Sequence, residues 1–420
     1  MSRLLWVSLT VLLGAVAVGI YWNYDGFDPE SLRGATVVIN GLQYRNRRRD
    51  WRTSTPDWER RSSSQARREN RLKEVVAKAK SLGAQEAHYV AGDMGKAEDC
   101  ERTIQTALEK FGRTDNYKSR QQQFIEGKLK PWDQDPDVDF FVDFLNINLV
   151  SYVRLAFLAL PLLKESKGHI VVLSSAAGKI PWPFLTFYSS VKFGLDGFFS
   201  SLRVELMKAQ QDVSVTLVVL GIIGTPTIVQ SLQNTPEMLS MVAPVDQTAM
   251  AIIRGGATRA REIYHPFFVW PLAKFEVLMP QIMDYLATKE VRLVKKSKGY
   301  TVVIGSIGGK VPSPNLSFYS SVKFGLDGFF SSLRVELMKA QQDVSVTLAV
   351  LGFIATPTFS NHLKTEPDGD KVLENFAPID ETALAVIRGG ATRAREIYYP
   401  FYTWPFSKLR ALMPELLTFD

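Results

Sequence analysis

The chain has 420 residues, of which 46% are hydrophobic and 22% are charged. These proportions are those of globular proteins, and they exclude a wholly disordered, collagen-like or polytopic membrane protein. Much of the formal net charge of +7 comes from arginines within residues 43–64. The single cysteine, Cys100, excludes an intrachain disulfide framework and a multi-cysteine metal cluster, and we expect no metal site.

Residues 1–23 read as a membrane signal. The run Leu4–Trp22 carries no charge and is about long enough to cross a bilayer. Arg3 precedes it and acidic residues follow it, so the remaining chain is lumenal if the basic end stays cytoplasmic. The run predicts a signal anchor. Because Ala15-Val16-Ala17 is a small-x-small site, a cleaved signal peptide is the alternative.

The next part of the chain alternates between strand and helix patterns, which predicts a Rossmann-like, doubly wound parallel α/β sheet over residues 24–290. Segments 40–64 and 116–127 are atypical because they are polar and follow neither period. We expect strands at 35–39, 87–91, 168–173 and 213–220, and helices at 72–82, 97–111, 140–163 and 188–208.

An internal repeat organises the rest of the chain. Phe187–Leu217 is identical to Phe318–Leu348, and Arg254–Tyr264 recurs as Arg388–Tyr398. Each copy reads as strand, loop, helix and strand, which is one parallel crossover unit. We therefore predict a linker at 291–298 and a duplicated catalytic half at 299–420. Both copies would compete for one place in a sheet, so one must dock peripherally, swap between chains or pack poorly.

The residues that carry chemistry lie on the repeated unit. Tyr188 and Lys192 are four apart in a predicted helix, so their side chains share one face. A nearby ammonium group would lower the pKa of the phenol by stabilising the phenolate. Ser175, at a strand end, could hydrogen-bond the substrate oxygen. The second copy repeats this set as Ser306, Tyr319 and Lys323.

With this set, the chain resembles the short-chain dehydrogenases/reductases and, within them, the 11β-hydroxysteroid dehydrogenase type 1 group with its 1-like members. Specific motifs are Asn23-Tyr24-Asp25-Gly26-Phe27-Asp28-Pro29, Phe193-Gly194-Leu195-Asp196-Gly197-Phe198-Phe199 and Gly255-Gly256-Ala257. The resemblance implies that Tyr188 is the general acid/base, Lys192 lowers its pKa and holds the nicotinamide ribose, Ser175 orients the carbonyl, and Asn148 anchors a proton-relay water.

The same resemblance implies further cofactor contacts. Asp93 would contact the adenine, and Ile223 and Thr225 would bind the carboxamide. Arg67 and Arg68 fall where the family faces the adenosine ribose, and cationic side chains there favour a 2′-phosphate, hence NADP. An ordinary solvated helix start is the alternative for these two arginines.

One departure concerns the phosphate loop. A dinucleotide-binding strand should open into a glycine-rich turn, yet no glycine lies between Gly41 and Gly83. One set of codons for Asn40–Asp50, read one nucleotide later, encodes TGSSTGIGEE, so we hypothesise that residues 40–64 are an out-of-frame translation. Sequencing the transcript tests this hypothesis.

The resemblance therefore implies an NADP-dependent oxidoreductase that interconverts a hydroxyl and a ketone on a hydrophobic, steroid-like substrate. It would sit in the endoplasmic reticulum membrane with a lumenal catalytic part, or be secreted if the signal is cleaved. A homodimer is left open, and we expect no nucleic-acid partner for the arginine tract. The alternative is a catalytically inactive relative, or a misassembled gene product, that acts at most as a membrane-bound interaction protein.

Overall fold

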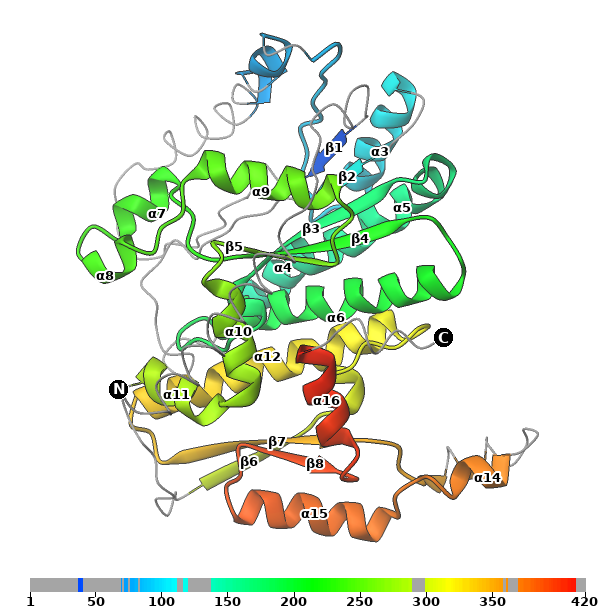
Figure 1. Cartoon of the computed structure of the whole chain (residues 1–420), viewed down its shortest axis with the longest axis vertical. Coiled ribbons are helices and arrows are strands. Elements are labelled where there is room, and N and C mark those ends of the chain that lie inside the picture. Colours follow the sequence, from blue (N-terminus) through cyan, green and yellow to red (C-terminus); the bar gives the residue numbers. More distant parts are fainter. Residues whose placement is uncertain are drawn as a thin grey trace, which may run out of the picture.

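The computed structural model of the chain describes residues 37–40, 69, 72–74, 76–81, 84–111, 116–119, 137–288, 299–357, 360–361 and 369–412. Two parallel sheets organise these residues (Figure 1). The strands of the first sheet are β1 (Val37–Asn40), β2 (Asn116–Ser119), β3 (His169–Ser175), β4 (Ser214–Leu220) and β5 (Glu262–His265). Those of the second are β6 (Gly299–Ile304), β7 (Val344–Leu351) and β8 (Glu396–Tyr399).

Helices connect and cover these strands. In the first half they are α3 (Ala97–Phe111), α4 (Val138–Leu145), α5 (Ser151–Ser166), α6 (Thr186–Lys208), α7 (Pro226–Ser231), α8 (Pro236–Leu239), α9 (Val245–Ala257), α10 (Val269–Leu278) and α11 (Pro280–Thr288). In the second half they are α12 (Ser317–Lys339), α14 (Gly369–Leu373), α15 (Ile379–Ala391) and α16 (Thr403–Leu412).

All strands of the first sheet run parallel in the order β1-β2-β3-β4-β5. In the register of β3 and β4, Ser175 lies beside Leu220. The carboxyl ends of these two strands therefore meet at one edge, which is where ligands bind in open α/β sheets. The predicted parallel α/β architecture is confirmed.

The strand predicted at residues 87–91 is wrong. These residues form no strand. At the end of the segment, Arg102 donates to the carbonyl of Ala91 at 2.8 Å, and the amide of Asp93 donates to Asp99 Oδ2 at 2.6 Å. Residues 116–119, which lie in a segment that the sequence marks as atypical, form β2 between β1 and β3.

The two faces of the first sheet are covered by different helices. On one face, Leu155 of α5 and Leu195 of α6 pack in a buried cluster with Ile170 of β3. On the other face, Val171 and Val218 pack in a cluster with Ile252 of α9. This is the two-sided burial expected of a parallel sheet.

The second copy forms its own sheet, in the order β6-β7-β8, and docks peripherally. Figure 1 shows the layers in the order α9, first sheet, α6, α12, second sheet, α15, so α6 and α12 lie side by side in the middle of the molecule. Of the three arrangements that the sequence allows, the structure adopts peripheral docking.

The anchor predicted at residues 1–23 lies outside the described residues. Among the described residues, the helical stretch Val138–Ser166 is the one helix that is long and apolar enough to cross a membrane by length and composition. Its part in α5 buries Tyr152, Leu155 and Leu163 completely against the first sheet. This packing accounts for the apolar residues on one side of α5, whereas Phe157 of the same helix is exposed.

Candidate active site

Ser175 is the last residue of β3 and begins a short 3₁₀ turn, Ala176–Gly178. Its Oγ accepts a hydrogen bond from the amide of Ala177 at 3.2 Å. Serine is favoured at such a cap because its oxygen satisfies an amide that the turn leaves free. This contact fixes the hydroxyl at the carboxyl edge of the sheet.

Helix α6 brings Tyr188 and Lys192 to the same edge. Lys192 is buried, with 2% of its surface exposed, and its Nζ donates to the carbonyl oxygen of Leu173 in β3 at 3.0 Å. The same Nζ lies 5.6 Å from the centre of the Tyr188 ring. Burial lowers the pKa of the Lys192 ammonium to about 8. The predicted pairing of the two side chains on one helix face is seen in the structure.

The pKa of Tyr188 differs from the sequence expectation. Burial raises the pKa of the phenol, while a hydrogen bond with Ser175 acts in the lowering direction. The lowering expected from Lys192 does not outweigh this burial, and the ammonium group lies over the ring while it donates to the Leu173 carbonyl. Burial therefore favours the protonated phenol over the phenolate.

Asn148 lies in a π-helical turn, Asn146–Val150, between α4 and α5. Its side chain is 2% exposed, and its Nδ2 donates to the carbonyl of Phe144 at 2.9 Å. The next residue, Leu149, lies against Gly194 of α6, where an added Cβ would stand 3.1 Å away. Single π turns are frequent at functional sites, and this one packs on the helix of Tyr188.

The predicted cofactor residues lie in different places. Ile223 and Thr225 follow β4, beside the strand end that carries Ser175, and the Thr225 amide donates to the Ile223 carbonyl at 2.7 Å. Asp93 accepts from the amide of Gly95 at 3.0 Å. Arg67 and Arg68 lie outside the described residues.

Sequence reasoning missed two aromatic residues at the site. Tyr152 is completely buried, and Lys192 Nζ lies 5.9 Å from the centre of its ring. Phe144 packs at 6.5 Å, centre to centre, from the ring of Tyr188. The signal was present, since Phe144, Asn148 and Tyr152 follow each other at steps of four and so share one helical face.

The second triad has the same local geometry in an open setting. Ser306 accepts from the amide of Gly308 at 3.1 Å, and Lys323 donates to the carbonyl of Ile304 at 3.2 Å. Lys323 Nζ lies 5.7 Å from the Tyr319 ring centre. Tyr319 is nevertheless 43% exposed. In the described second half, three strands form the sheet and no counterpart of α4 or α5 covers Tyr319.

A parallel sheet that gathers a serine, a tyrosine and a lysine at its carboxyl edge defines an α/β oxidoreductase of the dehydrogenase type. The comparisons agree with this class. A family model described as short chain dehydrogenase matches residues 61–236 and 282–367. The chain therefore belongs to the short chain dehydrogenase family.

The chain is similar to Hydroxysteroid 11-beta-dehydrogenase 1-like proteins. It is 37% identical to that of Gallus gallus over 267 residues, which cover 63% of this chain and 90% of the relative. It is 35% identical to that of Xenopus tropicalis over 278 residues, covering 64% and 92%. Among solved structures, a Cj0485 dehydrogenase matches with a TM-score of 0.41 and 17% identity over 46% of this chain and 78% of that chain.

Proposed function

We propose that the first copy is an NADP-dependent oxidoreductase that interconverts a hydroxyl group and a ketone on a hydrophobic, steroid-like substrate. The observation that carries this proposal is the set Ser175, Tyr188 and Lys192 gathered at the carboxyl edge of β3 and β4. The proposal that the substrate is steroid-like rests on the names of the relatives.

The side chains divide the proton chemistry between them. In ketone reduction, the Tyr188 phenol donates its proton to the carbonyl oxygen, and Ser175 donates a hydrogen bond to the same oxygen. Burial raises the pKa of Tyr188 and so favours the protonated phenol over the phenolate. The Lys192 ammonium then stabilises the phenolate. In alcohol oxidation the phenolate takes the hydroxyl proton back.

A nicotinamide cofactor fits the donors at this edge and, when bound, supplies or takes up the hydride. Lys192 has three ammonium protons, of which one meets the Leu173 carbonyl, so it retains donors for ribose hydroxyls. Ile223 and Thr225 would hold the carboxamide. We propose that Arg67 and Arg68 favour the 2′-phosphate of NADP, with Asp93 at the adenine and Asn148 at a proton-relay water.

We further propose that the first triad works and that Ser306, Tyr319 and Lys323 do not. The exposure of Tyr319 favours this assignment, because solvent screens charges and competes for the proton. We also propose an endoplasmic reticulum membrane location with a lumenal catalytic part, which rests on the uncharged run Leu4–Trp22.

The second candidate is a catalytically inactive relative. The specific observation in its favour is the absence of glycine between Gly41 and Gly83, because a pyrophosphate needs close approach to backbone amides after the first strand. Such a chain would act at most as a membrane-bound interaction protein.

Cofactor binding separates the two candidates. NADPH and NADH are titrated into the full chain in detergent and followed by nicotinamide fluorescence, and reduction of a steroid ketone is then measured. We expect NADPH to bind at least about tenfold more tightly than NADH, and the double variant Arg67→Ala/Arg68→Ala to narrow this gap. Failure of both nucleotides to bind would favour the inactive relative.

A further inference from the structure

Helices α6 and α12 pack against each other through reciprocal hydrogen bonds. Thr186 Oγ1 of α6 donates to Glu336 Oε2 of α12 at 2.8 Å. Ser317, the equivalent of Thr186 in the second copy, donates through its Oγ to Glu205 Oε1 at 2.6 Å. Glu205 is in turn the equivalent of Glu336. Matched contacts of this kind are the mark of a two-fold, isologous interface.

The apolar contacts are reciprocal as well. Phe187 of α6 meets Phe329 of α12 at 6.1 Å between ring centres. The equivalent pair with the copies exchanged, Phe318 and Phe198, meets at 5.5 Å. The sequence repeat has therefore produced a self-complementary face, in which each copy offers the same side chains to the other.

Two glycines allow the helices to approach closely. A Cβ on Gly197 would stand 2.8 Å from the Cβ of Phe324, and a Cβ on Gly328 would stand 2.8 Å from the Cβ of Phe193. Since contacts below 3.0 Å are not tolerated between packed carbons, a larger residue at either position forces the helices apart. The close approach is again the same on both sides.

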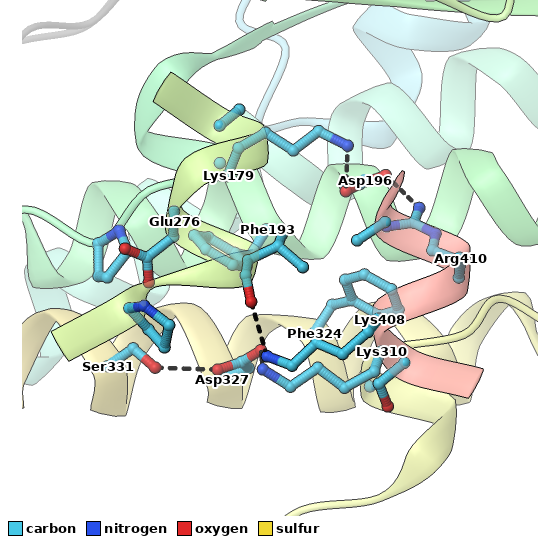
Figure 2. A pocket seen from close by; sticks show the side chains of 18 of the residues that line it. Lys179, Phe193, Asp196, Glu276, Lys310, Phe324, Asp327, Ser331, Lys408 and Arg410 are labelled. Carbon is cyan, nitrogen blue, oxygen red and sulfur yellow. Dashed lines mark hydrogen bonds and ion pairs between the residues drawn. The ribbon is translucent and has the colours of Figure 1, made fainter. Parts of the chain in front are cut away.

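A cavity of about 110 Å³ lies between the copies (Figure 2). Both copies line it with the same ion pairs. Lys179 Nζ pairs with Asp196 Oδ2 at 2.8 Å, and the equivalent Lys310 pairs with Asp327 at 2.6 Å. Asp196 also accepts from Arg410 Nη2 of α16 at 3.1 Å, so the second copy reaches the catalytic helix there too.

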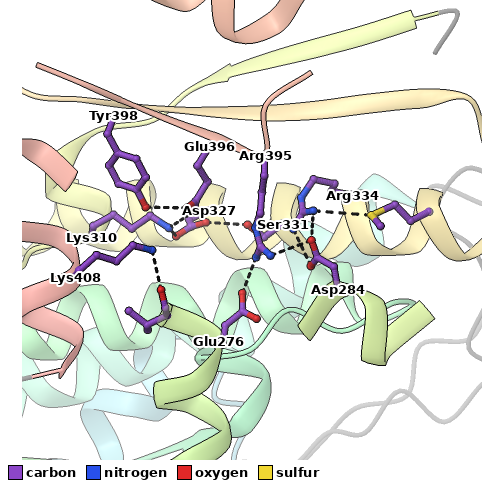
Figure 3. A network of polar contacts seen from close by, with 12 residues as sticks. Glu276, Asp284, Lys310, Asp327, Ser331, Arg334, Arg395, Glu396, Tyr398 and Lys408 are labelled. Atoms are coloured by element: carbon purple, nitrogen blue, oxygen red, sulfur yellow. Dashed lines mark hydrogen bonds and ion pairs between the residues drawn. The ribbon is translucent and has the colours of Figure 1, made fainter. Parts of the chain in front are cut away.

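Buried charged side chains of the second copy contact α10 and α11 of the first (Figure 3). Arg395, which precedes β8, pairs with Glu276 of α10 at 2.6 Å and with Asp284 of α11 at 2.9 Å. Arg334 of α12 pairs with the same Asp284. Removing one partner of such a buried network is costly because a charge is left uncompensated. The second copy is thus fixed to the first and is not a loosely attached appendage.

Glu336 contacts the start of the catalytic helix. The first residue before α6, Leu185, makes no side-chain cap. Glu336, which is 2% exposed, accepts instead from the amide of Phe184 at 3.1 Å and from the hydroxyl of Thr186 at 2.8 Å. These two contacts hold the chain on both sides of Leu185, and a negative charge near a helix N-terminus interacts favourably with the helix dipole. Tyr188 lies in this first turn.

We propose that residues 299–412 act as a built-in partner subunit: they occupy the self-complementary face of α6, so that the full chain does not pair with a second chain there, and Glu336 is a positioning residue for the helix that carries Tyr188. The catalytic part of this proposal rests on the proposed function, whereas the structural part does not.

The reciprocity supplies a matched control. Glu336→Ala and Glu205→Ala remove the same atoms from the same interface, but the first removes contacts at the start of α6 and the second removes contacts at the start of α12. In the full chain, we expect Glu336→Ala to speed hydrogen exchange at residues 184–190 about tenfold. We expect it to lower kcat about tenfold while KM for NADPH changes less than twofold. Glu205→Ala should speed exchange at residues 315–321 and leave kcat within twofold. Glu336→Gln keeps an acceptor oxygen and should restore most of kcat.

Several outcomes would overturn the proposal. The first is unchanged hydrogen exchange at residues 184–190 in both Glu336 variants. The second is an equal loss of kcat in Glu336→Ala and Glu205→Ala. The third is a wild-type dimer, measured by light scattering, that the Gly197→Leu substitution dissociates into monomers. If the wild type lacks activity, the proposed function fails, yet hydrogen exchange and light scattering still decide the structural part. Should Glu336→Ala not fold, the exchange measurement on Glu336→Gln replaces it, with a smaller expected change of about threefold.

Discussion

Helices α6 and α12 have the same sequence apart from their first residue, yet they differ in what surrounds them. Val191 of α6 is completely buried, whereas its equivalent Val322 is 61% exposed. Helix α4 covers the start of α6, where Phe141 stacks on Phe187 at 4.4 Å between ring centres. The same triad therefore has a half-buried tyrosine and a buried lysine in one copy, and an exposed tyrosine and a half-buried lysine in the other.

The difference between α6 and α12 shows that residue identity and spacing do not by themselves determine the burial of this site. Lys192 and Lys323 both donate to a carbonyl of the preceding strand, at 3.0 Å and 3.2 Å. Only Lys192 is enclosed to 2% exposure, and burial brings its pKa to about 8. The difference in burial comes from the elements that cover α6, and the following variants test whether it produces a functional difference.

The largest expected effect separates the two tyrosines. Tyr188→Phe removes the proton donor of the enclosed site, and we expect ketone reduction to fall by about 10³-fold, within the range typical of general acid catalysis. Tyr319→Phe should leave kcat/KM within about twofold. Steady-state kinetics of both variants measures this contrast, and equal losses would mean that both triads contribute.

A charge introduced at the paired valines tests the contrast in burial. Val191→Asp places a carboxylate where the valine has no exposed surface, and we expect a loss of at least about 3 kcal/mol in the free energy of unfolding. Val322→Asp, on the exposed equivalent, should cost within about 0.5 kcal/mol. Urea denaturation measures both values. Similar losses would show that Val322 of α12 is buried in solution.

The pKa of Lys192 adds a pH dependence to the enclosed site. In the folded chain this pKa is about 8, lower than the ordinary value of 10.5, so between these values the unfolded chain binds more protons. The free energy of unfolding should therefore gain about 1–3 kcal/mol from this group as pH rises from 8 to 10.5. Lys192→Met should remove this gain. The matched variant Lys323→Met should retain it, because Lys192 is intact there.

Much of the fold could be predicted from local patterns. Strands β3 and β4 and helix α6 are where apolar runs and helical spacing place them, and these three elements carry Ser175, Tyr188 and Lys192. The signals are strong because buried parallel strands are continuously apolar and the helix has a regular apolar face. Elements that depend on their own side chains are thus readable from the sequence.

Other features depend on partners that a sequence does not display. Residues 87–91 have strand composition, but Arg102 and Asp99 take their neighbouring backbone groups. Residues 116–119 are polar, yet they pair between β1 and β3. Strand formation depends on the available neighbours more than on composition. The rise in the Tyr188 pKa and the separate second sheet likewise follow from packing between distant segments.

The last expected effect concerns Glu276, which joins the two copies through its contact with Arg395. Burial raises the pKa of the Glu276 carboxyl to about 7, against the lowering effect of Arg395. Its ordinary value is 4.5, so between pH 4.5 and 7 the folded chain binds more protons than the unfolded one. This group therefore makes the free energy of unfolding fall by about 1–3 kcal/mol as pH rises through that range. Glu276→Gln should flatten the curve, and the informative quantity is the wild-type minus variant difference in urea denaturation at each pH. A difference that does not vary with pH would mean that Glu276 stays charged beside Arg395, and that the two copies are joined there by a full ion pair.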